Sequence, residues 1–237
     1  MHLPDLRPDY DFVVVNGENA HGGKGLSKPA YKKIREAGAD LVTLGNHAWD
    51  HKDVLELLPS EPVIRALNYP EGTPGRGWWR LEKGGHSLGV AQVMGRVGMN
   101  LQLDDPFRAV DRLLAEEGGG NWLLEVHAEA TSEKYGLGHY FDGRVAAVLG
   151  THTHVATADA GFLPGGTAIQ ADVGMTGPLT THSIIGGEVE GFLTRFLTQR
   201  PTYFKAASGR AQFCATELVV ENGRCTSIQP HRWEEFE

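Results

Sequence analysis

The amino-acid sequence predicts an α/β fold. Two observations carry this prediction: short apolar runs rich in β-branched residues alternate with helical patterns over the first 60 residues, and further buried strands follow later in the chain. Alternating strands and helices are the signature of a parallel sheet covered by helices. No repeat or long linker divides the 237 residues, so we expect a single domain over residues 1–237.

The first four predicted elements are a strand, a helix, a second strand and a second helix. Both strands are apolar runs that end in polar residues, which is typical of buried parallel strands. Ser27 is the predicted N-cap of the first helix, and Asp50 is that of the second. The strands span residues 11–16 and 40–45, and the helices span residues 27–37 and 51–58.

The rest of the chain mixes antiparallel and buried strands. Short alternating runs between residues 62 and 98 favour antiparallel pairing, and a helix is predicted over residues 106–117. Buried strands are predicted over residues 122–126 and 144–149. The segment 213–230 has the pattern of a closing hairpin.

The two cysteines are not expected to form a disulfide. Residues 221–224 have the pattern of a two-residue hairpin turn, which places Val220 opposite Cys225. Cys214 then lies six residues along the strand, roughly 20 Å away at about 3.3 Å per residue. That separation is too large for a disulfide.

Composition excludes some classes of function. The formal net charge is -8 and the pI is about 5.8, which argues against a surface that follows an extended nucleic acid, because that surface needs clustered Lys and Arg. No apolar run reaches the roughly 18 residues of a membrane span, and the first residues do not resemble a signal peptide. We therefore expect a cytoplasmic protein that does not bind membranes. The sequence leaves open whether the protein forms a homo-oligomer.

Polar side chains suited to metal binding follow four of the predicted strands. Ligands of open α/β sheets bind at the carboxyl ends of the strands, so residues far apart in the sequence are expected to converge there. His152 and His154, two apart after a strand, share a face if the backbone stays extended. The complete set is Glu18, Asn19, Asn46, His47, His127, His152 and His154.

Each of these residues also has an ordinary structural reading. Glu18 taken alone fits a helix cap or a solvated loop, and Asn46 fits an Asx turn after a glycine. The histidines taken alone fit packed or surface positions. The convergence at one sheet edge is what favours a metal site.

The mixture of carboxylate, amide and imidazole groups favours a transition metal. Such ligands suit Fe, Mn or Zn better than Mg or Ca, which prefer oxygen ligands. Two such ions about 3.5 to 4 Å apart can share a hydroxide nucleophile and stabilise an in-line displacement at phosphorus. We expect two divalent ions, with Fe or Mn favoured and Zn as the alternative.

Four motifs resemble the bacterial metallophosphoesterases of the YmdB type, within the calcineurin-like superfamily. The resemblance runs through the whole chain, and the third motif is specific to this branch. The motifs are Asn16-Gly-Glu-Asn19, Gly45-Asn-His-Ala-Trp-Asp-His51, His127-Ala-Glu-Ala-Thr-Ser-Glu-Lys134 and Gly150-Thr-His-Thr-His-Val155. The resemblance implies a four-layer α/β/β/α sandwich and activity on 2′,3′-cyclic nucleotides and other phosphodiesters.

The resemblance also implies a role for each residue. Glu18 would bridge the two metals, and Asn46, His127 and His152 would bind one of them. His154 would bind the other with Asn19 close by, and His47 would act on the substrate as the catalytic residue. Glu129, Thr131, Ser132 and Glu133 would orient His127 or contact substrate, although ordinary loop hydrogen bonding explains these four equally well.

The chain departs from the resembled family at its beginning. Family members begin with a buried strand ending in an aspartate that binds the same metal as His154, and nothing before residue 11 matches it. Asp5 and Asp9 lie in a proline-flanked segment. The expectation is therefore an N-terminally incomplete domain that lacks its first strand and one metal ligand.

The expected function is metal-dependent hydrolysis of a small phosphodiester, most of all a 2′,3′-cyclic nucleotide. A phosphomonoesterase is one alternative, because the same metal centre serves both reactions. A catalytically weak metal- or nucleotide-binding protein that acts through partners is the other. Comparing the turnover of a phosphate monoester with that of a phosphodiester separates the two enzyme hypotheses.

Overall fold

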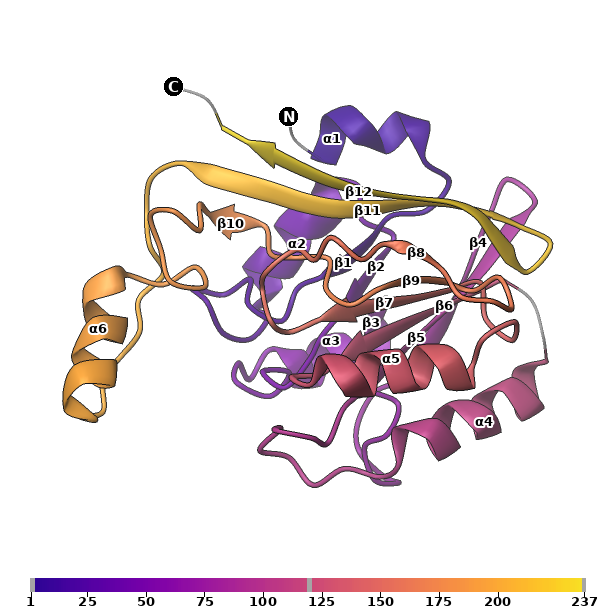
Figure 1. Ribbon diagram of the computed structural model, residues 1–237, viewed down its shortest axis with the longest axis horizontal. Coiled ribbons are helices and arrows are strands. Elements are labelled where there is room, and N and C mark those ends of the chain that lie inside the picture. Colours follow the sequence, from indigo (N-terminus) through magenta and orange to yellow (C-terminus); the bar gives the residue numbers. More distant parts are fainter. Residues whose placement is uncertain (1–2, 119–120, 236–237) are drawn as a thin grey trace.

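The computed structural model describes residues 3–118 and 121–235 (Figure 1). The helices are α1 (Leu3–Leu6), the 3-10 turn η1 (Arg7–Asp9), α2 (Lys28–Glu36), α3 (Val54–Ser60), α4 (Pro106–Glu117), α5 (Thr131–Tyr140) and α6 (Val189–Thr198). The strands are β1 (Val14–Asn16), β2 (Leu41–Thr43), β3 (Val63–Ile64), β4 (Trp78–Lys83), β5 (His86–Met94), β6 (Trp122–His127), β7 (Ala147–Thr151), β8 (Gly161–Phe162), β9 (Ala168–Gln170), β10 (Gly177–Pro178), β11 (Ala211–Glu221) and β12 (Arg224–Glu234).

These strands form three sheets in the described part of the chain. The first is parallel, with the order β1-β2-β3. The second has the order β4-β5-β6-β7-β9-β8, with parallel pairing from β5 to β9 and an antiparallel strand at each edge. The third, β10-β11-β12, is antiparallel. The mixture agrees with the predicted combination of parallel and antiparallel pairing.

The first two sheets pack face to face, and helices cover their outer faces. On β2, Val42 packs in the core with α2 and α3, whereas its neighbour Leu41 packs with Val90 of β5. On β5, Val93 packs in the opposite core with Val110 of α4. Since successive strand residues point to opposite faces, the layers run helix, sheet, sheet, helix. The predicted four-layer α/β/β/α sandwich is confirmed.

The long C-terminal hairpin extends the inner layer. Leu218 and Cys225 of this hairpin pack against Ala147 of β7 and Ala168 of β9. Figure 1 shows the β11–β12 pair running across the sheet on the side away from α4 and α5, while α6 projects from the body. The hairpin therefore shields the inner face of β7 and β9.

The predicted hairpin turn and the absence of a disulfide are confirmed. Glu221 pairs with Arg224, and Val220 pairs with Cys225. Asn222 has a φ of 51° and Gly223 a φ of 81°, which are the positive values that a type I′ turn requires. Cys214 pairs with Arg232, far along the ladder, and both cysteines are free and buried.

One of the two predicted helix caps is wrong. Ser27 caps α2 as predicted, since its side chain accepts a hydrogen bond from the Ala30 amide. The second helix begins only at Val54, so Asp50 lies outside it and bonds to His47 instead. Residues 51–53 form turns because the Asp53 carboxylate accepts the backbone N–H of Lys28, which ties this segment to α2.

No helix among the described residues is long and apolar enough to cross a membrane. The strands predicted over residues 122–126 and 144–149 correspond to β6 and β7, although β7 begins three residues later than predicted. The sequence did not predict α5 or α6. Of these two helices, α5 begins four residues after the end of β6 and lies on the same side of the sheet as α4 (Figure 1).

Candidate metal centre

The loop after β1 turns Glu18 into the protein. Gly17 continues the pairing with β2 through its N–H bond to the Thr43 carbonyl at 2.9 Å. The Asn16 side chain then accepts the Glu18 N–H at 3.2 Å. These bonds close a tight turn, and Glu18 is only 3% exposed. The carboxylate therefore lies beneath the sheet edge rather than in solvent, which removes the structural reading of Glu18 as a solvated loop residue.

The loop after β2 leaves room for the functional groups because it begins with glycine. A Cβ on Gly45 would lie 2.2 Å from Glu18 Oε2 and 2.5 Å from His127 Nε2. Such contacts are impossible, so only glycine lets these two side chains meet. The next residue, Asn46, has its Oδ1 2.8 Å from His127 Nε2.

Three strand ends contribute to one cluster of metal-capable atoms. Glu18 Oε1 lies 3.3 Å from His127 Nε2, and His152 Nδ1 lies 3.1 Å from the same nitrogen. One ligand atom from each of these residues falls within 4.8 Å of the others. With Asn46 beside them, the structure brings together four of the residues singled out in the sequence.

The remaining two predicted ligands lie beside this cluster. The Asn19 amide nitrogen is 3.3 Å from His154 Nε2 and 3.4 Å from Glu18 Oε1. Asn19 Oδ1 is buried and accepts no hydrogen bond from the described residues. The other ring nitrogen of His154, Nδ1, faces the Ile185 carbonyl at 3.2 Å. Glu18 thus lies between the cluster around His127 and the Asn19–His154 pair.

The two histidines after β7 do not sit on an extended backbone, so that part of the prediction is wrong. β7 ends at Thr151, and φ is 97° at His152 and 67° at His154. Non-glycine residues rarely adopt such values. The backbone is held there by Asp172, which accepts both the N–H and the hydroxyl of Thr153, at 3.0 and 2.8 Å.

A buried ion pair supports this strained segment. Lys134 Nζ lies 2.9 Å from Asp172 Oδ2, and both side chains are almost fully buried. Removing one partner of a buried pair typically costs about 3–5 kcal/mol. A Cβ on Gly150 would lie 1.8 Å from the Ala171 carbonyl oxygen, so glycine is also required where β7 approaches this support.

The four residues predicted to orient His127 or contact substrate have different surroundings. Glu129 lies 3.2 Å from His152 Nε2, so it faces His152 and not His127. Glu133 accepts the backbone N–H groups of Arg96 and Val97 and thereby orders the neighbouring loop. Thr131 and Ser132 are exposed at the start of α5. Thr131, Ser132 and Glu133 lie in the first turn of α5, which the loop interpretation did not anticipate, whereas Glu129 precedes the helix.

His47 lies at the edge of the cluster with its own carboxylate partner. Its Nδ1 is 2.9 Å from Asp50 Oδ2, and its backbone N–H bonds to Glu18 Oε2 at 3.3 Å. With Nδ1 occupied by Asp50, the Nε2 atom of His47 is the one left for other partners. This is the geometry of a general acid oriented by a carboxylate.

Burial shifts the titration of the cluster. Removal from water raises the pKa of Glu18 to about 8, against the hydrogen bond from the His47 backbone, which lowers it; the charges of Glu125 and Asp50 add smaller rises. Desolvation lowers the pKa of His127 well below its usual value and also lowers that of His152. The imidazoles are therefore neutral near pH 7, as metal ligands must be.

The donor set fits divalent cations. It combines a carboxylate, two amide oxygens and three imidazoles, which suits Fe, Mn or Zn. Asn19 Oδ1 is buried and has no hydrogen-bond donor among the described residues, and two further acceptor atoms, Asn46 Oδ1 and Glu18 Oε1, face His127 Nε2. A cation satisfies such atoms, whereas an empty low-dielectric pocket leaves them unpaired at a cost.

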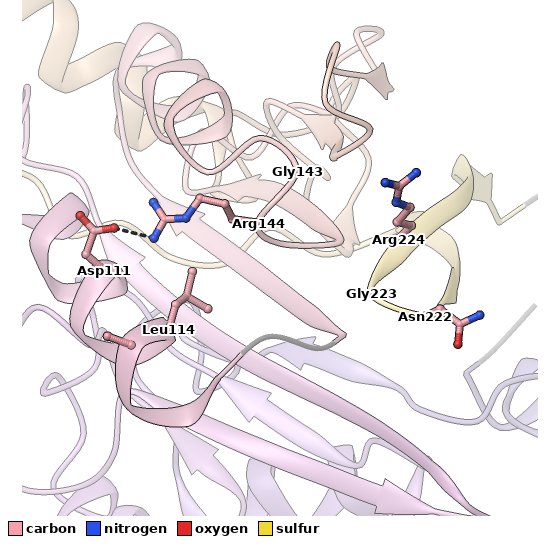
Figure 2. Close-up of a pocket in the computed structure, with 8 residues that line it drawn as sticks. Asp111, Leu114, Gly143, Arg144, Asn222, Gly223 and Arg224 are labelled. Atoms are coloured by element: carbon pink, nitrogen blue, oxygen red, sulfur yellow. Dashed lines mark hydrogen bonds and ion pairs between the residues drawn. The ribbon is translucent and has the colours of Figure 1, made fainter.

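A second hollow lies at the opposite ends of the strands (Figure 2). It is lined by Asp111 and Leu114 of α4, by Arg144 before β7, and by Arg224 in the hairpin. Arg144 is already paired with Asp111 at 2.7 Å. Open parallel sheets bind ligands at the carboxyl ends of their strands, which favours the metal-capable cluster over this hollow as the functional site.

Sequence reasoning overlooked several groups that support the cluster. Thr151 contacts His127 Nδ1 at 2.9 Å, and Glu125 accepts the Thr151 hydroxyl at 2.9 Å. A signal for Glu125 was present, because a carboxylate inside the apolar run Leu-Leu-Glu-Val needs hydrogen-bond partners. Lys134 and Asp172 are separated by 38 positions and carried no pairing signal.

Comparison with known proteins finds close relatives over nearly the full chain. The chain is 42% identical over 236 residues to the 2′,3′-cyclic-nucleotide 2′-phosphodiesterase of Bacillus subtilis, covering 98% of this chain and 88% of the relative. A crystal structure of a hypothetical protein from Thermus thermophilus has 66% identity and a TM-score of 0.96, covering 99% of this chain and 92% of the other. A crystal structure of a novel phosphatase from Mycoplasma pneumoniae has 31% identity and a TM-score of 0.90, covering 98% and 86%.

The family assignment rests on the same span. The family model described as YmdB-like protein matches residues 1–231, which include all four motifs and every residue of the cluster. The resemblance stated for the four motifs is therefore confirmed. This chain belongs to the YmdB-like family.

Proposed function

We propose that this protein hydrolyses phosphodiesters, and 2′,3′-cyclic nucleotides above all, with two divalent cations held at the strand ends. The observation that carries this proposal is the convergence of Glu18, Asn46, His127 and His152 with the adjoining Asn19–His154 pair. The Bacillus subtilis relative supports the choice of substrate, since its name specifies a 2′,3′-cyclic nucleotide.

In this proposal Asn46, His127 and His152 would hold one cation, His154 with Asn19 would hold the other, and Glu18, which lies between the two groups, would be shared by both. When bound, the two cations stabilise charge on the phosphoryl group and make a water molecule nucleophilic at neutral pH. Iron or manganese as the native metal, a cytoplasmic location and a homo-oligomeric state stay predictions.

His47 would deliver a proton to the leaving oxygen. Asp50 Oδ2 lies 2.9 Å from Nδ1 and so orients the ring, which leaves Nε2 available for the substrate. Glu129, bonded to His152, would orient that ligand, whereas Thr131 and Ser132 are exposed and free to contact substrate. Glu133 would act indirectly through the loop it orders.

Turnover of a defined set of phosphate esters tests the proposal. With manganese added to chelator-treated protein, 2′,3′-cyclic AMP is expected to react faster than 3′,5′-cyclic AMP and than the monoester 3′-AMP. The 3′-monophosphate is the expected product if the 2′ ester is cleaved, as in the relative's name. Faster release of phosphate from the monoester would instead indicate a phosphomonoesterase. Metal binding without turnover of any ester would indicate a binding protein.

Metal affinity is expected to fall as the pH falls below about 8. The pKa of Glu18 is raised to about 8, so at lower pH its carboxyl must release a proton before it binds a cation. His127 and His152, with lowered pKa values, are already neutral and release none. Affinity should change by up to about tenfold per pH unit between pH 6 and 8.

Isothermal titration with manganese at pH 6, 7 and 8, in buffers of different ionisation heat, measures both affinity and released protons. Glu18→Gln is the matched control, because it keeps the shape of the side chain without the titrating proton. Equal affinities at pH 6 and 8 in the unmodified protein would contradict this linkage.

A further inference from the structure

A chain of hydrogen bonds, each buried or partly buried, runs beneath the candidate metal centre and ends on His127. Its central group is Glu125 of β6, which is 6% exposed. The single oxygen Oε1 lies 2.7 Å from Asn16 Nδ2, 2.9 Å from Gln92 Nε2 and 2.9 Å from Thr151 Oγ1. These partners come from β1, β5 and β7, so the carboxyl joins the two facing sheets at the level of the site.

Backbone groups determine which way the two amides point. Asn16 donates from Nδ2 to the Leu44 carbonyl at 3.1 Å and accepts the Glu18 N–H on Oδ1 at 3.2 Å. Gln92 donates from Nε2 to the same Leu44 carbonyl. A carbonyl can only accept and a backbone N–H can only donate. Both amides therefore present N–H groups to Glu125.

The direction of the Thr151 hydrogen bond follows. Glu125 Oε1 already accepts two N–H groups, so it carries no proton and Thr151 must donate its single hydroxyl hydrogen to it. Burial raises the pKa of Glu125, but a protonated carboxyl still has one oxygen without a hydrogen. The direction is thus the same for either protonation state of Glu125.

The Thr151 oxygen then has only lone pairs to offer to His127. His127 Nδ1 lies 2.9 Å from it, so Nδ1 must carry the hydrogen. A neutral imidazole has one ring hydrogen, which leaves Nε2 with a lone pair. That nitrogen faces Asn46 Oδ1 at 2.8 Å and Glu18 Oε1 at 3.3 Å, so acceptor atoms converge where a cation would bind.

We propose that Glu125 and Thr151 are positioning residues that hold His127 in its Nδ1–H tautomer and so reserve Nε2 for a metal ion. The tautomer follows from the hydrogen-bond directions at Nδ1 for a neutral imidazole, whereas Asn46 Oδ1, 2.8 Å from Nε2, would by itself favour a hydrogen on Nε2. Its use for metal binding rests on the proposed function. Outer partners of metal-bound histidines commonly contribute 10- to 100-fold to metal affinity.

Thr151→Val and Thr151→Ser test the proposal, because valine keeps the shape without the hydroxyl and serine restores the hydroxyl. Long-range ¹⁵N–¹H NMR on metal-free protein reports the tautomer, with His127 assigned by the loss of its signals in His127→Asn. The unmodified protein and Thr151→Ser should show the Nδ1–H form. Thr151→Val should move toward the Nε2–H form, which can donate to Asn46 Oδ1.

Manganese affinity provides the second readout. Thr151→Val should bind roughly 10- to 100-fold more weakly, and Thr151→Ser should bind like the unmodified protein. Glu125→Gln is the further control, since an amide oxygen can accept the same three hydrogen bonds, and it should keep the Nδ1–H form. Thr151→Ala takes the place of Thr151→Val if that variant does not fold.

The results separate this inference from the proposed function. An unchanged tautomer in both Thr151→Val and Thr151→Ala would overturn the inference, as would a lost Nδ1–H form in a folded Glu125→Gln. A tautomer that changes as expected in a protein that binds no manganese would support the hydrogen-bond polarity and overturn the proposed metal centre instead.

Discussion

Glu18→Ala is expected to lose both bound cations and to lower kcat/KM by on the order of 10³-fold or more, since two metal ions supply several kcal/mol of transition-state stabilisation. Glu18 Oε1 lies 3.3 Å from His127 Nε2 and 3.4 Å from the Asn19 amide, which in turn contacts His154. The carboxylate therefore reaches both halves of the site. Metal analysis of the purified variant measures the loss.

His154→Ala is the matched comparison, because His154 belongs to one half only and should lose chiefly one ion. The metal-free fold should tolerate Glu18→Ala. The pKa of Glu18 is raised by burial, so its ionised form destabilises the metal-free protein and its removal relieves that cost. Equal one-ion losses in the two variants would contradict a bridging role.

His47→Ala is expected to retain both metal ions and to lose roughly 10²- to 10⁴-fold in kcat, the usual contribution of a general acid. His47 is bonded to the ligand set through its backbone N–H, which donates to Glu18 Oε2, and alanine keeps this bond. The imidazole itself is bonded to Asp50. Steady-state kinetics combined with metal analysis separates the two effects.

Asp50→Asn provides a control for His47. The substitution removes the carboxylate that orients the His47 ring through Nδ1 but leaves the Nε2 atom of His47 in place. Its loss of kcat should therefore be smaller than that of His47→Ala. A metal-replete His47→Ala protein with unchanged kcat would remove His47 from the mechanism.

The position of the site was predictable because it follows from topology. Glu18, Asn46 and His127 each follow an apolar strand, and parallel strands bring their carboxyl ends to one edge. What the pattern could not reveal is the local backbone. The positive φ values of His152 and His154 depend on Asp172 and Lys134, which lie elsewhere in the chain and act only through the folded structure.

The helix α5 shows the same limit for local structure. It contains Gly136 and Gly138, and each glycine costs about 1 kcal/mol relative to alanine within a helix. A Cβ on Gly138 would lie 2.5 Å from Ile169 Cδ1. Close packing on β9 therefore demands glycine where helix propensity argues against it. Asp50 was wrongly predicted as a helix cap. Its carboxylate bonds to the side chain of His47 instead of to a helix N-terminus.

In the described part of the chain β1 pairs with β2 only, and Asn16 at its end is exposed. No carboxylate other than that of Glu18 joins His127 and His152 in the metal-capable group found among the described residues.

The positions of bound cations test the central claim most directly. Crystals of the 237-residue chain grown with manganese can be measured at the manganese absorption edge. The account predicts two anomalous peaks about 3.5 to 4 Å apart, with the Glu18 carboxylate in contact with both, one peak beside His127 and the other beside His154. A single peak, or two peaks of which Glu18 touches only one, would contradict it.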